Sequence, residues 1–231
     1  MRLNNLDLYN FLVDENILAL YHANTVGTSC TYFQAGGLLS RGAVANLSLY
    51  QTPQTSDAAD QVLGVWNDIF LDTTDLHSHF HRENHYGPVL FELDRELVLN
   101  ENLEIWVTKN NPIYWNAWAP IAERYFADVA ELRQKWGVID RQRMMITIRN
   151  NTSPILFNYV RKIIVDDPKR IITVAGQNVI LFNAAASKIN NVVTTAHLLY
   201  GKLSTRTCGS CWCGSNYLHQ RSDADLFRFF L

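Results

Sequence analysis

The sequence has no long apolar run. No window approaches the roughly 18 uninterrupted apolar residues of a membrane-spanning helix, which excludes that class. Glycine and proline are few, at 11 and 6 of 231 residues, which excludes collagen-like and low-complexity chains. Only 18% of residues are charged and 48% are hydrophobic, which excludes a disordered chain. The first residues lack the basic start of a signal peptide, so we expect a cytoplasmic protein.

Cysteine is also scarce. The four cysteines are too few and too unevenly spaced for a secreted disulfide scaffold, so we expect reduced thiols or metal ligands. One cluster in a Gly/Ser-rich loop offers four soft ligands of the kind zinc takes: Cys208, Cys211, Cys213 and His219. The alternative is a tail with reduced cysteines. A second cluster, His77, His79, His81 and His85, is typical either of a metal site or of a polar loop.

Charge is distributed unevenly along the chain. Residues 1–140 contain 8 basic and 18 acidic residues, whereas residues 141–231 contain 12 basic and 4 acidic residues. A basic half indicates a phosphate-rich partner such as nucleic acid, because binding releases counterions from the phosphates. The alternative is that the two halves form ion pairs with each other.

The pattern of elements predicts an α+β protein built on antiparallel sheet. Short apolar runs bounded by turn residues predict strands over 17–22, 89–93, 103–108 and 144–148, and a hairpin over 171–182 with Gly176-Gln177 as its turn. Apolar spacing predicts helices over 120–136 and 184–200. Little strand–helix–strand alternation is present, which favours antiparallel pairing. We expect one domain over 1–170 and a basic extension with the cysteine cluster over 171–231, packed on the same domain.

Several short motifs, taken in order, resemble the DarT-type ADP-ribosyltransferases. Leu20-Tyr21-His22 matches a strand ending in Tyr-His, and Gly37-Leu38-Leu39-Ser40-Arg41 matches the Gly-Leu-Leu-Ser-Arg segment of that family. Residues 68–72, the strand at 86–91 and the segment 106–114 follow in the family's order. The resemblance covers roughly residues 15–165 and rests on the order of the motifs, since each is short.

This resemblance implies an ADP-ribosyltransferase-like fold, with split antiparallel β-sheets flanked by helices, and NAD as donor. It places Tyr21, His22, Ser40, Arg41 and Asp72 at the NAD site, with Arg41 also catalytic. Breaking the nicotinamide bond creates an oxocarbenium-like ribose, so the site needs hydrogen-bond donors for the ribose and a nearby carboxylate. The Arg41 guanidinium suits a pyrophosphate because its planar fork bonds two oxygens at once.

The catalytic acid departs from the family pattern. The family has a glutamate on a late strand, and the corresponding strand here has Met144 and Met145 instead. Glu104 is the preferred replacement because a strand fixes a side chain more closely than a loop does. Asp72 is the second candidate. Catalysis without an acid at that place, and a protein that binds without catalysing, both stay open.

The target would lie beside Asn110 and Tyr114, which can hold a base by hydrogen bonding and stacking. Arg143 and Arg149 belong to a basic set that fits a single strand without regard to its sequence: Arg141, Arg143, Arg149, Arg161, Lys162, Lys169 and Arg170. DNA and RNA both remain open as targets, because members of the family modify single-stranded nucleic acid and relatives in phage defence modify mRNA.

The leading prediction is therefore an NAD-dependent ADP-ribosyltransferase that modifies a nucleic-acid base as the toxin of a toxin–antitoxin or phage-defence system. An antitoxin protein partner is implied by the resemblance. One alternative is a non-catalytic nucleic-acid-binding protein with a zinc-bound tail, and another is an ADP-ribosyltransferase directed at a protein.

Overall fold

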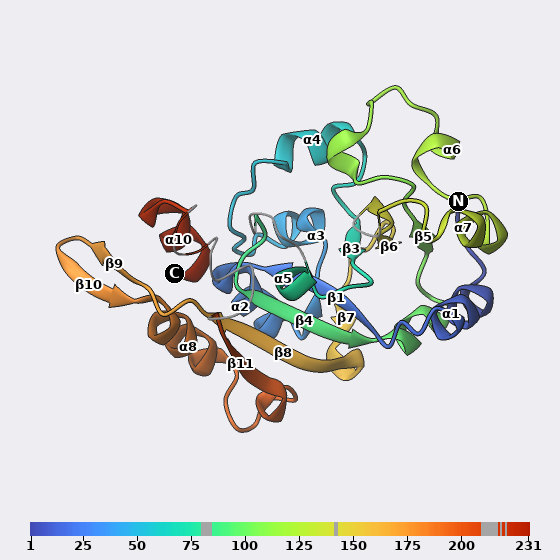
Figure 1. Ribbon diagram of the computed structural model, residues 1–231. Coiled ribbons are helices and arrows are strands. Elements are labelled where there is room, and N and C mark those ends of the chain that lie inside the picture. The colour runs from blue at the N-terminus through green and yellow to red at the C-terminus, as the bar shows by residue number, and fades with distance from the viewer. Residues whose placement is uncertain (80–84, 141–142, 209–216, 218, 220) are drawn as a thin grey trace.

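The computed structural model describes residues 1–79, 85–140, 143–208, 217, 219 and 221–231. Figure 1 shows strands in the middle of the molecule with helices around them. Among the described residues, no helix is both long and apolar enough to span a membrane. A single hydrophobic cluster runs from Leu3 to Phe230, so the two ends of the chain share one core.

A four-stranded sheet forms the centre of the fold. Its order is β1-β4-β8-β11, with the first three strands antiparallel and β11 parallel to β8. The apolar residues of β4 and β8 are almost completely buried, so these two strands lie at the centre of the core. The strands are β1 (Ala19–Asn24), β4 (Val89–Asp94), β8 (Val160–Asp167) and β11 (Leu203–Thr207).

Three smaller sheets accompany it. The antiparallel sheet β3-β6-β5 touches the edge of the central sheet, where Tyr21 and Asp72 exchange two backbone hydrogen bonds of 2.8 Å. The pairs β2–β7 and β9–β10 are antiparallel ribbons, and the second of them projects from the body in Figure 1. Their strands are β2 (Gly37–Leu38), β3 (Ile69–Leu71), β5 (Ile105–Val107), β6 (Ile146–Ile148), β7 (Ile155–Leu156), β9 (Ile171–Val174) and β10 (Gln177–Ile180).

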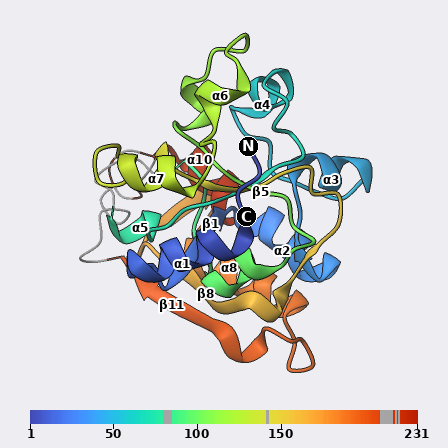
Figure 2. The ribbon, with the colours of Figure 1, turned by 90° about the vertical axis from the view of Figure 1, so that its right-hand side faces the viewer.

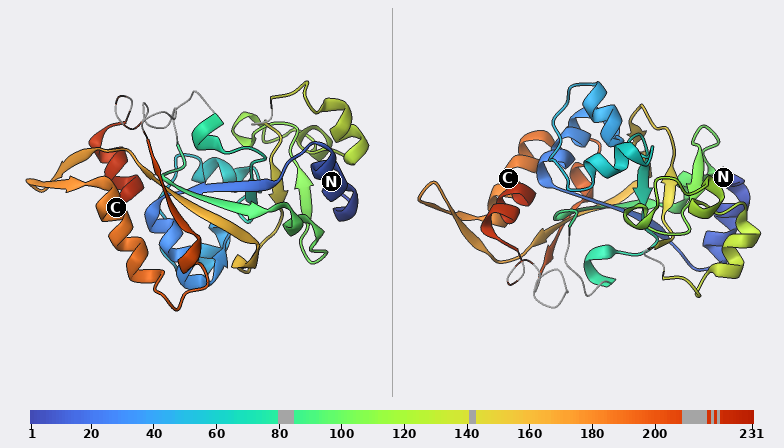
Figure 3. Two further views of the ribbon diagram at one scale, coloured as in Figure 1. Left: turned by 60° about the horizontal axis from the view of Figure 1, so that its bottom comes forward. Right: turned by 90° about the horizontal axis from the view of Figure 1, so that it is seen from above.

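Helices cover the sheets. Helix α8 packs on α2, β8 and α10 (Figure 3), and α1 packs on the other end of the molecule against α7 (Figure 2). The α-helices are α1 (Asn5–Asp14), α2 (Val26–Ala35), α3 (Arg41–Asn46), α4 (Asp57–Val62), α5 (Leu76–His79), α6 (Ile121–Arg124), α7 (Val129–Lys135), α8 (Leu181–Val192) and α10 (Asp223–Phe230). The 3-10 helices are η1 (Arg95–Leu99), η2 (Pro112–Tyr114), η4 (Phe157–Tyr159) and η5 (Tyr200–Lys202).

The α+β class with antiparallel sheets is confirmed, and so is a hairpin in the expected segment, although its turn is one residue earlier than Gly176-Gln177 and its second strand ends at Ile180, where α8 follows. Its turn residues Ala175 and Gly176 both have positive φ, as a two-residue hairpin turn requires. Strand β11 pairs with β8, and α10 packs on α2 and α8, so the C-terminal residues contact the central sheet and its helices. The division of the chain at residue 170 stays a prediction.

The helix predicted over 120–136 is wrong. The segment instead forms α6 and α7, separated by extended backbone at Tyr125. Tyr125 bridges Thr108, and the Phe126 N–H donates to the Val107 carbonyl, so the two aromatic residues are buried by extending sheet pairing. Asp128 then starts α7 by capping the Glu131 N–H. The other long helix also shifts, because α8 spans Leu181–Val192 where 184–200 was expected.

Candidate functional site

His22 stands on β1 with one ring nitrogen in use. Its Nδ1 lies 3.0 Å from the Phe70 carbonyl oxygen. A carbonyl can only accept, so Nδ1 carries the hydrogen of this bond. Burial lowers the pKa of His22 despite the bond to Phe70, which keeps the ring neutral near pH 7. Nε2 is therefore an acceptor, and it is buried without a partner among the described residues.

Arg41 is the first residue of α3, and two neighbours fix where that helix begins. The Ser40 hydroxyl accepts from the Ala43 N–H at 3.1 Å and donates to the Asn151 carbonyl at 2.6 Å. Gly42 donates its N–H to the Trp66 carbonyl, and a Cβ at this glycine would lie 2.0 Å from Asn67 Oδ1. A Cβ here would displace the Trp66 and Asn67 side chains, so Ser40 and Gly42 hold the start of α3, and with it Arg41, against the segment that leads into β3.

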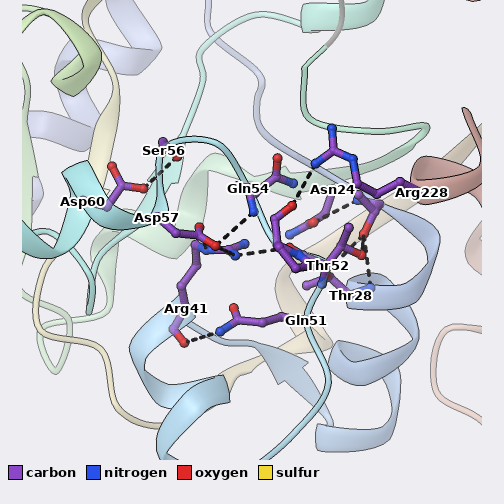
Figure 4. Close-up of polar contacts among 12 residues, drawn as sticks. Asn24, Thr28, Arg41, Gln51, Thr52, Gln54, Ser56, Asp57, Asp60 and Arg228 are labelled. Atoms are coloured by element: carbon purple, nitrogen blue, oxygen red, sulfur yellow. Dashed lines mark hydrogen bonds and ion pairs between the residues drawn. The ribbon is translucent and has the colours of Figure 1, made fainter. Parts of the chain in front are cut away.

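The guanidinium of Arg41 is held on one edge (Figure 4). Its Nε lies 2.7 Å and its Nη2 2.8 Å from the two Asp57 oxygens, and Nη2 also donates to the Thr52 carbonyl at 3.2 Å. The ring of Trp66 lies under the guanidinium at 5.4 Å. Nη1 has no hydrogen-bond partner among the described residues. The side chain is 18% exposed, so the guanidinium is largely desolvated, and its Nη1 donors are available to a ligand.

Comparison with known proteins finds a structural likeness. The fold is similar to that of a DarT protein. Thermus sp. 2.9 DarT in complex with ADP-ribosylated ssDNA matches 83% of this chain and 93% of that chain, with a TM-score of 0.48 and 11% identity. No family model and no curated protein matches the sequence.

Tyr32 connects His22 with Arg41. Its ring centroid lies 6.0 Å from that of His22, and its hydroxyl accepts a hydrogen bond from the Asn24 amide at 3.1 Å. Burial raises the pKa of Tyr32 to about 12, and the nearby Arg41 charge partly opposes this rise. Hydrogen bonds through Asn24, Thr25 and Thr52 lead from this phenol to the Arg41 guanidinium, so His22 and Arg41, two of the residues predicted for NAD, belong to one connected cluster.

Tyr21 points away from this cluster. Successive side chains of a strand face opposite sides, so Tyr21 lies on the other face of β1 from His22. Its cross-strand partner is Glu92, and burial together with the charges of Glu92 and Asp75 raises the pKa of Tyr21. Its backbone still joins the site, because it is bonded to Asp72 at the end of β3.

The two candidate acids stand at opposite ends of the small sheet. Glu104 precedes β5, so it lies outside the strand that was expected to position it, and its carboxylate accepts from Trp106 Nε1 at 2.9 Å and from the Asn150 amide at 3.3 Å. Asp72 follows Leu71, which pairs with Ile146. Asp72 thus lies beside the start of β6, next to Met145. Glu104 lies beside the end of β6, because Ile105 pairs with Ile148, and the start of α3 is bonded near this end through Ser40 and Asn151.

The residues predicted to contact the target separate into two groups. Tyr114 is 62% exposed, and the exposed Arg143 stacks on its ring at 5.7 Å. Asn110 supports this loop through its carbonyl, which accepts from Trp115 Nε1 at 2.9 Å. Arg149 is instead enclosed, with its guanidinium 4.9 Å from the Trp106 ring and its Nε 2.8 Å from Asp68.

Much of the basic set is paired within the chain. The pairs join the acidic and basic halves in several places and also fall within the basic half: Arg149–Asp68, Arg161–Glu92, Lys169–Asp167 and Arg170–Asp223. Arg206 and Asp75 form a further pair across the halves. The acidic half therefore neutralises part of the basic half, as the second interpretation of the charge pattern held. Arg141 lies outside the described residues.

The metal predictions remain open. Cys208 is buried and His219 is exposed, while Cys211 and Cys213 lie outside the described residues. Within the described part of the chain, no group of three or more His, Cys, Asp or Glu could hold a metal ion. His77 is buried at 2.7 Å from Asp166, and His85 bonds Arg221; His81 lies outside the described residues.

Sequence reasoning missed Asp57 and Thr52. Both lie in the polar segment between α3 and the start of α4, where no apolar periodicity marks an element. Thr52 is only 1% exposed, which is unusual for a threonine in such a segment. Its burial follows from contacts with α2 that are 24 and 27 residues away in the sequence, so no local signal could have indicated it.

Proposed function

We propose that this chain is an NAD-dependent ADP-ribosyltransferase that modifies a base in single-stranded nucleic acid. The observation that carries the proposal is the presence in one cluster of two groups that the described residues leave unused: the buried acceptor His22 Nε2 and the Arg41 Nη1 donors. The order of motifs that contain these residues adds support. An unpaired buried acceptor costs free energy, so a ligand donor at that nitrogen stabilises the bound state.

NAD fits the chemistry of this cluster. Arg41 would bind the pyrophosphate through Nη1, because its other edge is occupied by Asp57. His22 would accept at Nε2 from the nicotinamide amide or a ribose hydroxyl, because its Nδ1 already bonds the Phe70 carbonyl. Nε2 is buried in the structure, so NAD binding requires the group that covers this nitrogen to move. Ser40 would contribute by capping α3, which begins at Arg41, and Tyr21 by its backbone hydrogen bonds to Asp72.

The bond between the ribose and nicotinamide breaks and a bond from the same carbon to the base forms, with the proton of the base lost. A carboxylate near the ribose stabilises the positive charge that develops. Glu104 would serve from the α3 end of the small sheet and Asp72 from the His22 end. Glu104→Gln and Asp72→Asn, compared at equal stability, decide between them, since only the catalytic acid lowers kcat by orders of magnitude.

The target side has the features of a base-binding surface. Tyr114 and Trp118, at 62% and 91% exposed, lie at and after η2 on the way to α6, in a region that rises above the rest of the chain in Figures 1 and 2. The Arg124 guanidinium fixes this loop by donating to the Asn116 and Ala117 carbonyls. Exposed aromatic rings on a fixed loop stack on bases at little entropic cost.

Labelled NAD, incubated separately with single-stranded DNA, RNA and whole-cell protein, tests the proposal. We expect label on one nucleic acid, its loss in Arg41→Ala, and its retention in Arg133→Ala, an exposed arginine paired with Asp14. Label on protein would indicate a protein-directed enzyme. No label, together with salt-dependent nucleic-acid binding, would favour a non-catalytic binding protein. The methionines Met144 and Met145, at the place of the family's catalytic glutamate, are consistent with that alternative.

The biological role follows from the resemblance. An enzyme that attaches ADP-ribose to the bases of nucleic acid would harm its own cell, so we propose a toxin with an antitoxin protein as partner, acting in the cytoplasm in phage defence. Expression in a bacterial host tests this, because wild-type protein should arrest growth and Arg41→Ala should not. Zinc bound by the cysteine cluster stays a separate prediction, which metal analysis of purified protein addresses.

A further inference from the structure

We propose that Asp57 positions Arg41 for the NAD pyrophosphate, and that Arg228 of the C-terminal helix holds the segment that carries Asp57. The inference rests on the proposed function and adds two residues to it. It starts from the geometry of the Arg41 guanidinium, whose Nε and Nη2 point to Asp57 while Nη1 bonds none of the described residues.

Asp57 leaves the Nη1 group of Arg41 open for a phosphate oxygen, while Nη2 bonds both Asp57 and the Thr52 carbonyl. An arginine can present two donor edges, one through Nε and Nη2 and one through the two Nη atoms. Asp57 takes the first edge with both carboxylate oxygens and thereby fixes the plane of the guanidinium. Trp66 packs beneath that plane at 5.4 Å. The arginine is thus preorganised, and a ligand that bonds Nη1 need not immobilise a free side chain.

The segment 51–57 is itself firmly attached (Figure 4). The Thr52 N–H donates to Thr28 Oγ1 at 2.9 Å, and the Thr52 and Thr25 hydroxyls lie 2.7 Å apart. The Gln51 amide donates to the Arg41 carbonyl at 3.1 Å. Asp57 also accepts from the Gln54 N–H at 2.9 Å, so the carboxylate is oriented by its own segment.

Arg228, near the C-terminus, binds the segment 51–57 through a hydrogen bond to its backbone. It extends from α10 and donates from Nη1 to the Pro53 carbonyl at 2.8 Å, 175 residues away in sequence. The guanidinium packs on the Phe229 ring at 4.9 Å, and Phe229 is fully buried. Helix α10 therefore contributes to the NAD site without touching the ligand.

NAD titration and steady-state kinetics of Asp57→Ala, Asp57→Asn and Arg228→Met test this inference. We expect Asp57→Ala to raise Kd and KM for NAD about tenfold, the loss of one charge-assisted interaction, while kcat changes less than about threefold. Asp57→Asn keeps one oxygen for Arg41 and should recover part of the affinity. Arg228→Met should raise KM about threefold, and Arg228→Lys should restore it.

Asp60→Asn is the matched control. Asp60 lies one turn further along α4 and bonds Ser56 at 2.9 Å rather than Arg41, so we expect unchanged NAD affinity. Unchanged affinity in Asp57→Ala would overturn the inference while leaving the proposed function intact. Tighter binding in Asp57→Ala would also overturn it, because Asp57 would then compete with the pyrophosphate. Wild-type protein that binds no NAD would overturn the proposed function and this inference together.

Discussion

Removing Arg149 should destabilise the fold strongly, although Arg149 belongs to the basic set that suggested nucleic-acid contact. Its Nε lies 2.8 Å from Asp68, whose side chain is fully buried, and its guanidinium packs between the Trp106 and Tyr125 rings at 4.9 and 5.1 Å. Arg149→Ala leaves a buried carboxylate without its partner, which typically costs about 3–5 kcal/mol. We expect a loss of at least about 3 kcal/mol in the free energy of unfolding, measured by urea denaturation.

The control is Arg143→Ala, an exposed arginine that stacks on Tyr114, for which we expect a change within about 0.5 kcal/mol. A second test uses pH. Burial raises the pKa of Asp68 even with Arg149 present, and Arg149→Ala should raise it further. A raised pKa means that the folded state binds the proton more tightly, so the variant should regain stability as the pH falls toward about 4. Equal losses in Arg149→Ala and Arg143→Ala, independent of pH, would refute the reasoning.

Three further predictions concern the site. Wild-type stability should fall as the pH drops below about 6.5, because the unfolded state protonates His22 before the folded state does, and His22→Gln should show a shallower slope in pH-dependent melts. Gly42→Ala should lose NAD affinity, measured by calorimetry, because its Cβ would clash with Asn67, whereas Gly201→Ala, with open space around it and no positive φ, should retain it. Trp118→Ala should weaken single-stranded nucleic-acid binding by about 1–3 kcal/mol in fluorescence titrations and leave NAD affinity unchanged; equal loss of both affinities would contradict separate sites.

Local patterns in the sequence were sufficient for the elements whose cause is local. The hairpin of β9 and β10 could be predicted because Gly176 marks its turn, although the turn is Ala175-Gly176 and not Gly176-Gln177 as expected. Strand β4 follows from a short apolar run after Gly87-Pro88. The helix expected over 120–136 is wrong because Tyr125 and Phe126 are extended and buried, and they pair with Thr108 and Val107, which lie outside the predicted helix.

For the candidate site, the sequence by itself indicated His22 and Arg41 through motif order, and it indicated a mixed fold through composition and short strands. Only the tertiary structure decided which nitrogen of His22 is bonded, since that depends on the carbonyl of Phe70. It also decided that Arg149 faces Asp68 and that Asp57 faces Arg41. Charge can be counted along a chain, but ion pairs depend on which segments the fold brings within about 4 Å of each other. The energy of a desolvated ion pair therefore cannot be deduced from the net charge of either half of the sequence.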